Sequence, residues 1–519
     1  MPIASAIALT GGLDFFEIIG MREGFDIVIG NPPYGVKVSD AVKDEFSLGS
    51  KDSYGVFTSL GLKILKPGGT LSFIMSDTWQ TIRTHKELRD QLLSQTDVQY
   101  LISVPNDTFA ATVNPGVYSF IKRLKPEQGG DNWILAADFS PLSIEKGDVE
   151  TAFELLMEQD MECIDRVDAS SVTDTALQTK DGDTICSDRE MAIFAYRQKL
   201  IPRFSNHSFF IASPKLFGLM CDTGRTKFDE KGRIVHLVEF NGKELELVKL
   251  GDVAEVKKGI DTGNNKTFLF KVHAAHGNYR TVDYDKVLVD EDIKCLSDNQ
   301  KYNGIKEGKF ILPYDKGGES DVGRAWLPNY WVPTQYFIDW SKQSVAKLYK
   351  AKLNAKNQST IRNSHFWFHK GLTFSLTGVY SPTVRLNSGA LFDNKSSCIF
   401  SKIKAALLLG ILCSKLTKYI FKNFIMHTVD TQVGAFNNFT MVNIEKNITL
   451  QNLVSSIITK QKQNPRYDYM TNEQIEIDKL IYQMYNLNEE DIREVESWYF
   501  RRYPRLAGVI EEKLKERIE

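Results

Sequence analysis

The chain has 519 residues, of which 42% are hydrophobic and 25% are charged, with 35 Gly and 16 Pro. This ordinary globular composition excludes collagen, extended disorder and a simple coiled coil, and the length predicts about three domains at roughly 150 residues each. The N-terminus lacks the layout of a signal peptide, and no run approaches the ~18 apolar residues of a membrane span. We therefore expect a cytoplasmic protein with no membrane partner.

The six cysteines lie far apart and form no CxxC pair. Zinc clusters and disulfide scaffolds depend on more closely grouped cysteines. We therefore expect neither a metal site nor a disulfide framework.

The net charge of −2 conceals an uneven distribution. Residues 341–444 contain 14 Lys and Arg against two Asp, whereas residues 126–190 contain 17 acidic residues against four basic ones. The basic stretch, with aromatic and His side chains at 365–369, favours a nucleic acid partner because each neutralised phosphate releases condensed counterions. A solvated charged face is the alternative interpretation. We assign no chemistry to the acidic stretch, whose residues 144–161 predict an amphipathic helical connector.

The first 125 residues predict alternating strands and helices. Residues 25–30 form a β-branched run typical of a buried parallel strand, and two prolines end it in the turn Asn31-Pro32-Pro33-Tyr34-Gly35. A helix, a buried strand, a second helix and an antiparallel pair of strands at the sheet edge are expected next, at residues 53–65, 70–75, 84–94, 98–104 and 117–122. This order predicts an open α/β sheet that binds ligands at the carboxyl ends of its strands.

The turn Asn31-Pro32-Pro33-Tyr34 contains the groups that methylation of an exocyclic amine requires. The lone pair of such a nitrogen, for example N6 of adenine, is delocalised into the ring, so the enzyme should accept hydrogen bonds from the amino group. The side-chain oxygen of Asn31 and the carbonyl of Pro32 are neutral acceptors that the two prolines stiffen. Tyr34 can stack on the base, which is worth roughly 1–3 kcal/mol and helps to offset the cost of base flipping. The alternative is a Pro-rich turn that only ends a buried strand.

Around this turn the chain resembles the amino-group adenine-specific DNA methyltransferases with an NPPY motif, in particular the TaqI-like and type IIG restriction–modification enzymes. The resemblance extends from Leu13-Asp14-Phe15-Phe16, through the helix that follows the turn, to Ser76-Asp77-Thr78-Trp79 and Phe109. It implies that Asn31, Pro32 and Tyr34 are catalytic and that Tyr34 and Phe109 enclose the flipped adenine. It also implies that Asp14, Phe15 and Pro33 contact S-adenosylmethionine. For Phe109, a core position under a β-hairpin is the alternative.

The resemblance continues into a specificity domain that begins near residues 250–265, with later landmarks at 391–393, 407–416 and 478–487. In this family the specificity domain reads double-stranded DNA, which would explain the local positive charge. The candidate DNA-contacting residues are basic and come from this region: Lys257, Lys258, Lys342, Lys347, Lys350, Arg362, Arg385 and Lys395. Arg362 and Arg385 are favoured for base contacts because Arg reads base edges more often than Lys does.

The sequence also departs from the family. A complete enzyme of this family forms its S-adenosylmethionine pocket on an earlier strand, a Gly-rich turn and a second strand that ends in an acidic residue. Thr10-Gly11-Gly12 is too short and too isolated to be that turn. We therefore expect an incomplete pocket and consider a separate N-terminal methyltransferase or nuclease polypeptide a candidate partner. Two tripeptides match the nuclease D/E-x-K pattern in residue type only: Glu255-Val256-Lys257 and Asp292-Ile293-Lys294. No nuclease is predicted.

The predicted fold is α/β, with a partial Rossmann-like methyltransferase sheet, an α+β target-recognition domain and a helical C-terminus. The expected segments are the catalytic part, an acidic helical connector, the recognition domain and a C-terminal helical segment, at residues 1–125, 126–245, 246–450 and 451–519. The predicted function is adenine-N6 DNA methylation in a prokaryotic restriction–modification or defence system. The alternatives are an inactive or truncated DNA-recognition module, and a methyltransferase that acts on RNA or on a protein amide.

Overall fold

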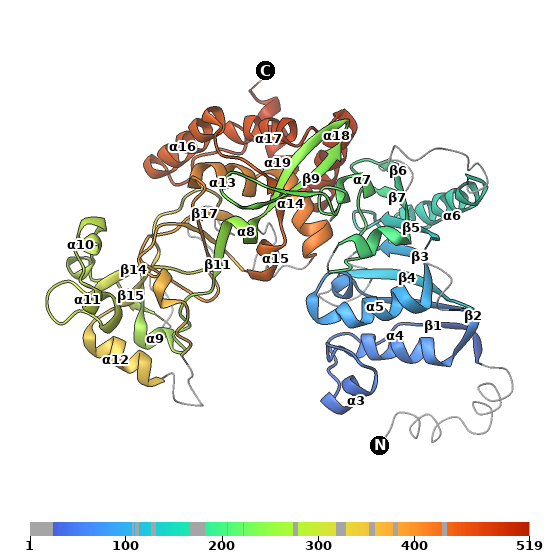
Figure 1. Cartoon of the computed structure of the whole chain (residues 1–519), viewed down its shortest axis with the longest axis horizontal. Helices are drawn as coiled ribbons and strands as arrows, with labels where there is room; N and C mark the ends of the chain where they lie inside the picture. The colour runs from blue at the N-terminus through green and yellow to red at the C-terminus, as the bar shows by residue number, and fades with distance from the viewer. Residues whose placement is uncertain are drawn as a thin grey trace.

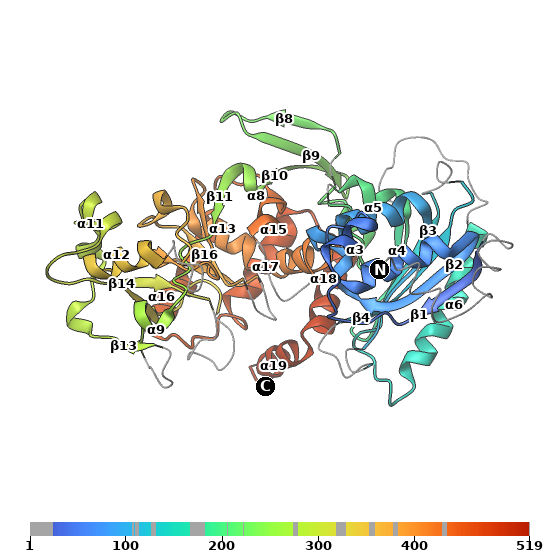
Figure 2. The same cartoon turned by 90° about the horizontal axis from the view of Figure 1, so that it is seen from below.

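The computed structural model describes residues 24–105, 108, 114–125, 131–166, 182–204, 206–221, 223–272, 279–317, 328–351, 359–376, 382–427 and 433–517. The molecule is elongated: a large sheet lies at one end, a smaller mixed α/β part lies at the other, and the C-terminal helices lie between them (Figures 1 and 2). The mixed α/β architecture expected from the sequence is therefore observed.

The sheet at one end has seven strands in the order β1-β2-β4-β3-β5-β7-β6. Its strands, in chain order, are β1 (Phe25–Gly30), β2 (Leu65–Ser76), β3 (Thr96–Ser103), β4 (Pro115–Lys122), β5 (Trp133–Asp138), β6 (Gly182–Ser187) and β7 (Ala192–Arg197). β1 pairs with β2 in parallel, and β4 lies antiparallel between β2 and β3, which is itself parallel to β5. The carboxyl ends of β1, β2, β3 and β5 therefore meet at one edge.

Helices cover the two faces of this sheet unequally. The helices α3, α4 and α5 span Asp40–Glu45, Ser53–Ile64 and Lys86–Gln95, and short 3-10 helices η1 and η2 span Asp77–Gln80 and Arg83–His85. α4 and α5 bury Val56, Leu62 and Leu88 against the odd-numbered side chains of β2. On the opposite face, α6 (Asp148–Arg166) packs on β3, β5 and β7.

Two expectations about this sheet are wrong. The antiparallel pair β3–β4 exists, but it lies inside the sheet because β5, β6 and β7 extend the sheet beyond it. For the same reason, a boundary at residue 125 between a catalytic part and a helical connector cuts through one continuous sheet. The acidic segment contributes α6 as expected, but its flanks add strands. Short strands such as Trp133–Asp138 gave no sequence signal distinct from a loop-rich connector.

β1 is parallel, as expected, but it is not buried. Ile27 and Ile29 are 65% and 80% exposed, whereas Val28 packs against the core on the α4 side. Among the described residues, β1 pairs only with β2 and so lies at the sheet edge. The β-branched sequence predicts that both faces of β1 are buried. In the described structure only the face that carries Val28 packs against the core.

A second sheet begins the other half of the chain, in the order β20-β10-β9-β8. Its strands β8, β9, β10 and β20 span Thr226–Phe228, Ile234–Phe240, Lys243–Lys249 and Thr440–Val442. The β8–β9 hairpin projects from the body (Figure 2). The short helices η4 (Gln198–Arg203) and α7 (Pro214–Phe217) connect this sheet to the first one.

The distal part combines two small sheets with orders β11-β19-β16-β17 and β13-β12-β15-β14-β18. The first contains β11 (Ala254–Lys257), β16 (Leu372–Phe374), β17 (Val384–Leu386) and β19 (Cys398–Ser401). The second contains β12 (Leu269–Lys271), β13 (Arg280–Thr281), β14 (Ile311–Asp315), β15 (Tyr336–Asp339) and β18 (Leu391–Phe392). The helical elements of this part are α8 (Leu250–Val253), α9 (Asn265–Phe268), η5 (Tyr284–Lys286), α10 (Asp290–Lys294), α11 (Asp298–Asn303), α12 (Lys342–Ala351) and η6 (Ser364–Phe366).

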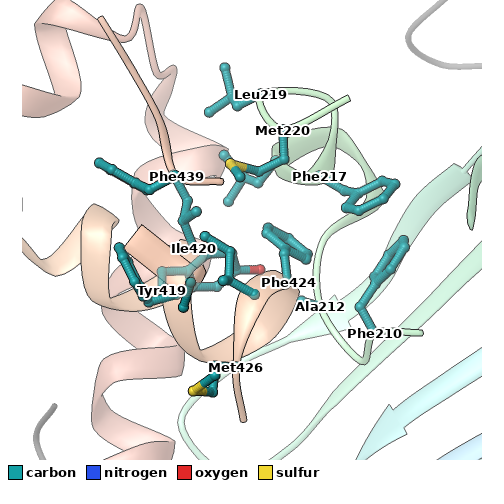
Figure 3. Close-up of a cluster of buried hydrophobic side chains, with 14 of the residues drawn as sticks. Phe210, Ala212, Phe217, Leu219, Met220, Tyr419, Ile420, Phe424, Met426 and Phe439 are labelled. Carbon is teal, nitrogen blue, oxygen red and sulfur yellow. The ribbon is translucent and has the colours of Figure 1, made fainter. Parts of the chain in front are cut away.

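The remaining helices follow β19. They are α13 (Ala405–Leu412), α14 (Lys415–Ile420), the π-helical turn η7 (Phe421–Ile425), α15 (Val433–Asn437), α16 (Ile448–Gln463), α17 (Glu473–Met484), α18 (Glu489–Arg502) and α19 (Pro504–Lys515). One apolar core runs from the large sheet into these helices. Figure 3 shows the junction, where Phe210 and Phe217 meet Tyr419 and Phe424. The ring centroid of Phe424 lies 5.4 Å from that of Phe210 and 5.3 Å from that of Phe217.

We predict that Phe424→Ala lowers the free energy of unfolding by about 3–5 kcal/mol, because it leaves a cavity in this fully buried junction. Urea unfolding followed by circular dichroism measures the change. Phe228→Ala is the matched control, because Phe228 on β8 is 75% exposed, and we expect it to change stability by no more than about 0.5 kcal/mol. Equal effects of the two substitutions would contradict the predicted junction.

Candidate active site at the carboxyl edge of the sheet

The turn Asn31–Gly35 starts where β1 ends, at the carboxyl edge of the sheet. Asn31 is exposed and Pro32 is buried. Among the described residues, none hydrogen-bonds with the Asn31 side chain or with the carbonyl of Pro32. Gly35 closes the turn with a φ of 70°, a backbone conformation that favours glycine. Two adjacent acceptor oxygens are thus left unengaged on a proline-stiffened turn.

The next two residues of the turn, Pro33 and Tyr34, are hydrogen-bonded. The Ser53 hydroxyl, at the start of α4, donates to the Pro33 carbonyl at 2.8 Å. The Tyr34 hydroxyl donates to the Ile74 carbonyl of β2 at 3.1 Å, and burial raises the pKa of Tyr34. These contacts fix the turn to the first helix and to the neighbouring strand.

Asp52, the residue before α4, makes the strongest electrostatic contacts near the turn. Its carboxylate accepts from Ser50 at 2.6 Å, forms an ion pair with Lys37, and lies 3.2 Å from Nε2 of His85. The hydrogen bond with His85 is the largest cause of a pKa well below the usual range for Asp, and burial opposes this shift. Asp52 therefore stays ionised.

The end of β2 fixes the other side of the site. The backbone N–H of Asp77 donates to the Asn114 carbonyl at 3.0 Å, and Nδ2 of Asn114 donates to the Asp77 carboxylate at 3.2 Å. These bonds hold one end of the connection between β3 and β4, which contains Phe109. Phe109 itself lies outside the described residues.

The predicted cofactor contacts are only partly described. Asp14 and Phe15 lie outside the described residues, and Pro33 is an exposed member of the turn. Nothing in the described part of the chain gathers three His, Cys, Asp or Glu side chains in a way that could hold a metal ion.

The predicted DNA contacts fall mostly on the surface of the distal part. Lys342, Lys347 and Lys350 are exposed on α12. Backbone pairing brings three other segments together, because Asp261 pairs with Thr360 and Ile260 pairs with Asp393. Lys257, Lys258, Arg362 and Lys395 belong to these three segments and are exposed or half-buried.

Arg385 does not fit the predicted DNA contact, because it is only 2% exposed. Its guanidinium donates to the hydroxyls of Ser375 and Ser396, and burial lowers its pKa to about 10. Lys418 and Lys422 are also buried. The charge balance of the sequence therefore counts cations that no DNA phosphate can reach in this structure.

A groove that the sequence did not predict lies between the β8–β9 hairpin and the distal part, with about 1840 Å³ of open space. Its basic lining residues are Lys231, Arg233, His365, His369, Lys370, Lys402 and Lys404, and its acidic ones are Asp252, Glu255 and Glu445. Five of the basic residues lie in the stretch 341–444, so the local charge signal included them but gave no way to choose them. Only folding brings the hairpin opposite this stretch.

A second hollow of about 590 Å³ lies at the carboxyl edge of the large sheet. Asp77, Ser103 and Asp138 line it from the ends of β2, β3 and β5, and His427 and Arg502 line it from the C-terminal half. Burial lowers the pKa of His427. The edge that carries Asn31 is thus continuous with the helices that follow the distal part.

Comparison with known proteins places the N-terminal part in a family. Residues 5–109 match the profile of the family described as Eco57I restriction-modification methylase. This match includes the turn at Asn31, α4, β2 and β3. The chain therefore carries a methylase domain of the restriction–modification class, as the sequence resemblance predicted.

Curated relatives match short stretches. A Methanocaldococcus jannaschii protein named as a type II restriction enzyme and methyltransferase is 34% identical over 101 residues, which is 19% of this chain and 8% of that protein. A type II methyltransferase of Thermus thermophilus is 32% identical over 96 residues, 15% of this chain and 22% of that one. The matches thus span less than a quarter of either relative.

Two solved restriction–modification enzymes align over most of the chain. The type IIL enzyme MmeI, in complex with DNA, aligns over 93% of this chain and 57% of its own, at 10% identity and a TM-score of 0.48. The type IIG endonuclease BpuSI aligns over 92% and 54%, at 12% identity and a TM-score of 0.31. Both TM-scores are below 0.5, so neither alignment establishes a shared fold.

Among the described residues, no helix has the length and apolarity needed to span a bilayer.

We predict that Asp52→Asn is less stable than the wild type by about 1 kcal/mol at pH 7, a value reduced by solvent screening of a partly exposed group. Because the folded pKa of Asp52 is lowered, its carboxylate stabilises the fold above the unfolded pKa of about 3.9, and this contribution is lost as the pH falls through the folded pKa. Urea unfolding at several pH values should show a constant difference from pH 7 to 5 and a shrinking one below about pH 4. A difference that widens in acid would contradict this assignment.

Proposed function

We propose that this protein transfers a methyl group from S-adenosylmethionine to the N6 amino group of an adenine in double-stranded DNA. The observation that supports this most directly is the turn Asn31–Tyr34, whose two unengaged acceptors lie at the carboxyl edge of the sheet. The family match covers the same residues. A prokaryotic cytoplasmic restriction–modification system is the setting that the proposal implies.

In the proposed site, the side-chain oxygen of Asn31 and the carbonyl of Pro32 accept hydrogen bonds from the adenine amino group. This interaction draws the nitrogen lone pair out of conjugation and so makes the amino nitrogen more nucleophilic. The exposure of Asn31 leaves room for a base that has left the duplex. The ring of Tyr34, held by its hydroxyl, would stack on one face of this base, and Phe109 would stack on the other.

The methyl donor supplies an electrophilic methyl group on a cationic sulfur. We propose Asp14, Phe15 and Pro33 as its contacts from this chain and a further polypeptide as a source of the remaining contacts. The exposed Ile27 and Ile29 support such a partner, because parallel strands usually have both faces covered. Calorimetric titration of the full chain with S-adenosylmethionine tests this point, and tight binding by the chain alone would overturn the proposed need for a partner.

We predict that Asn31→Ala abolishes methyl transfer in the reconstituted enzyme and leaves DNA affinity within about twofold, because it removes one acceptor without altering the distal surface. Transfer of labelled methyl groups to duplex DNA, RNA and protein measures the activity and distinguishes the alternative substrates. Asn299→Ala, at an exposed position of α11, is the matched control and should retain full activity. Loss of DNA binding together with activity would indicate a folding role for Asn31.

For DNA binding we propose the exposed and half-buried cations of the distal part: Lys257, Lys258, Lys342, Lys347, Lys350, Arg362 and Lys395. Arg385 is omitted because it is buried. The groove beside the β8–β9 hairpin extends this surface with Lys370, Lys402 and Lys404. An inactive recognition module would use the same surface, so binding alone does not separate that alternative from the proposed enzyme.

We predict that the triple change Lys342→Glu, Lys347→Glu and Lys350→Glu weakens DNA binding at least about tenfold and flattens the dependence of log affinity on log salt concentration by up to about 3 units. Fluorescence anisotropy with duplex DNA at several salt concentrations measures both. Lys479→Glu, on the exposed face of α17, is the control and should change neither quantity. A steep salt dependence that survives the triple change would place the phosphate contacts elsewhere.

A further inference from the structure

A chain of buried and half-buried polar groups connects the start of α4 to the end of β2. The hydroxyl of Tyr54 lies 2.8 Å from Nε2 of His85 and 2.7 Å from Oγ1 of Thr78. Nε2 of His85 lies 3.2 Å from the carboxylate of Asp52. Tyr54 and His85 are each only 3% exposed, and their rings stack with centroids 5.3 Å apart.

The acceptors in this chain determine where the protons lie. The Asp52 carboxylate already accepts from Lys37 and Ser50, so it presents a negative charge to His85. The nitrogen that faces a carboxylate carries the proton, hence Nε2–H of His85 donates toward Asp52 and toward the Tyr54 oxygen. The Tyr54 hydroxyl is then free to donate to Thr78. All the hydrogen bonds in the chain therefore run in one compatible direction.

This chain of hydrogen bonds reaches both sides of the candidate site. On one side, Asp52 precedes Ser53, whose hydroxyl holds the Pro33 carbonyl, and the segment 36–38 pairs with 51–53. On the other side, Thr78 belongs to η1, and its neighbour Asp77 holds Asn114 at the end of the β3–β4 connection. The same short helix is thus bonded to α4 on one side, through Tyr54, and to that connection on the other.

We propose that Asp52, His85, Tyr54 and Thr78 are positioning residues that set the Asn31 turn at a fixed distance from η1 and from the β3–β4 connection. None of them belongs to the predicted catalytic or cofactor set. The inference rests on the proposed methyl transfer, which needs acceptors held within a fraction of an ångström. This set of hydrogen bonds would preserve the distance when DNA enters, because its two central side chains, Tyr54 and His85, are buried.

A second cluster of the same chemistry provides the control. Asp90 on α5 accepts from Lys86 at 2.8 Å and lies 2.7 Å from Nδ1 of His207. This cluster also joins an Asp, a His and a Lys, yet none of its described contacts reaches the Asn31 turn. Ser59 matches Ser53 in the same way: both are serines of α4, and the Ser59 hydroxyl donates to Gln91.

The first test measures hydrogen exchange of the full chain by mass spectrometry, with urea unfolding as a check of global stability. We expect His85→Leu and Tyr54→Phe to speed exchange in the peptide 31–38 by about fivefold, the factor expected for loss of one buried hydrogen bond. His85→Gln, whose amide can still donate to Asp52, should stay within about twofold of wild type. Asp90→Asn and Ser59→Ala should leave this peptide unchanged, whereas Ser53→Ala should behave like Tyr54→Phe.

If His85→Leu does not fold, Tyr54→Phe decides the question, because it removes one oxygen and keeps the ring. Unchanged exchange in Tyr54→Phe, or an equal rise in Asp90→Asn, would overturn the proposal. The second test is methyl transfer: we expect kcat to fall at least about tenfold in Tyr54→Phe while the KM for DNA stays within about twofold. A wild-type enzyme reconstituted with the further polypeptide that methylates no substrate would overturn the proposed function, whereas the exchange result would still decide the positioning role.

Discussion

The feature on which the rest of this structure depends is a turn that keeps two acceptor oxygens unengaged while the next two residues, Pro33 and Tyr34, are hydrogen-bonded. Proline has no backbone N–H, so Pro32 and Pro33 cannot donate to the β1–β2 ladder. Ser53 engages the Pro33 carbonyl, and Tyr34 engages β2 through Ile74. The Asn31 side chain and the Pro32 carbonyl remain available because these neighbours hold the turn without using them.

The large sheet provides the position for this turn, and the apolar core provides the coupling to the rest of the chain. Parallel strands bring the ends of β1, β2, β3 and β5 to one edge, so residues distant in sequence meet there. The core then continues through Phe210 and Phe424 into the C-terminal helices (Figure 3). A hollow lined by Asp77 and His427 lies between these two parts. One continuous apolar core therefore joins the sheet that carries the Asn31 turn to the C-terminal helices.

The distribution of charged residues shows how far composition can predict a binding surface. The stretch 341–444 is strongly basic, and most of its cations are exposed as a polyanion-binding surface requires. Arg385 is buried beside Ser375 and Ser396, where its length and hydrogen-bonding capacity serve the fold. The sequence distinguishes Arg from Lys but not an inward from an outward side chain, since strand β17 is only three residues long. Periodicity over so short a strand has no predictive value.

By itself the sequence determined the strand–turn–helix around Asn31, the antiparallel pair β3–β4 and the methylase class, because each depends on local propensity or on contiguous residue types. Only the tertiary structure decided that β5, β6 and β7 extend the sheet and that Ile27 and Ile29 face outward. It also decided which side chains form the hydrogen-bonded set of Asp52, His85, Tyr54 and Thr78. These features depend on pairing between segments tens of residues apart. The sequence around a strand or side chain does not show which distant segment that strand or side chain will contact.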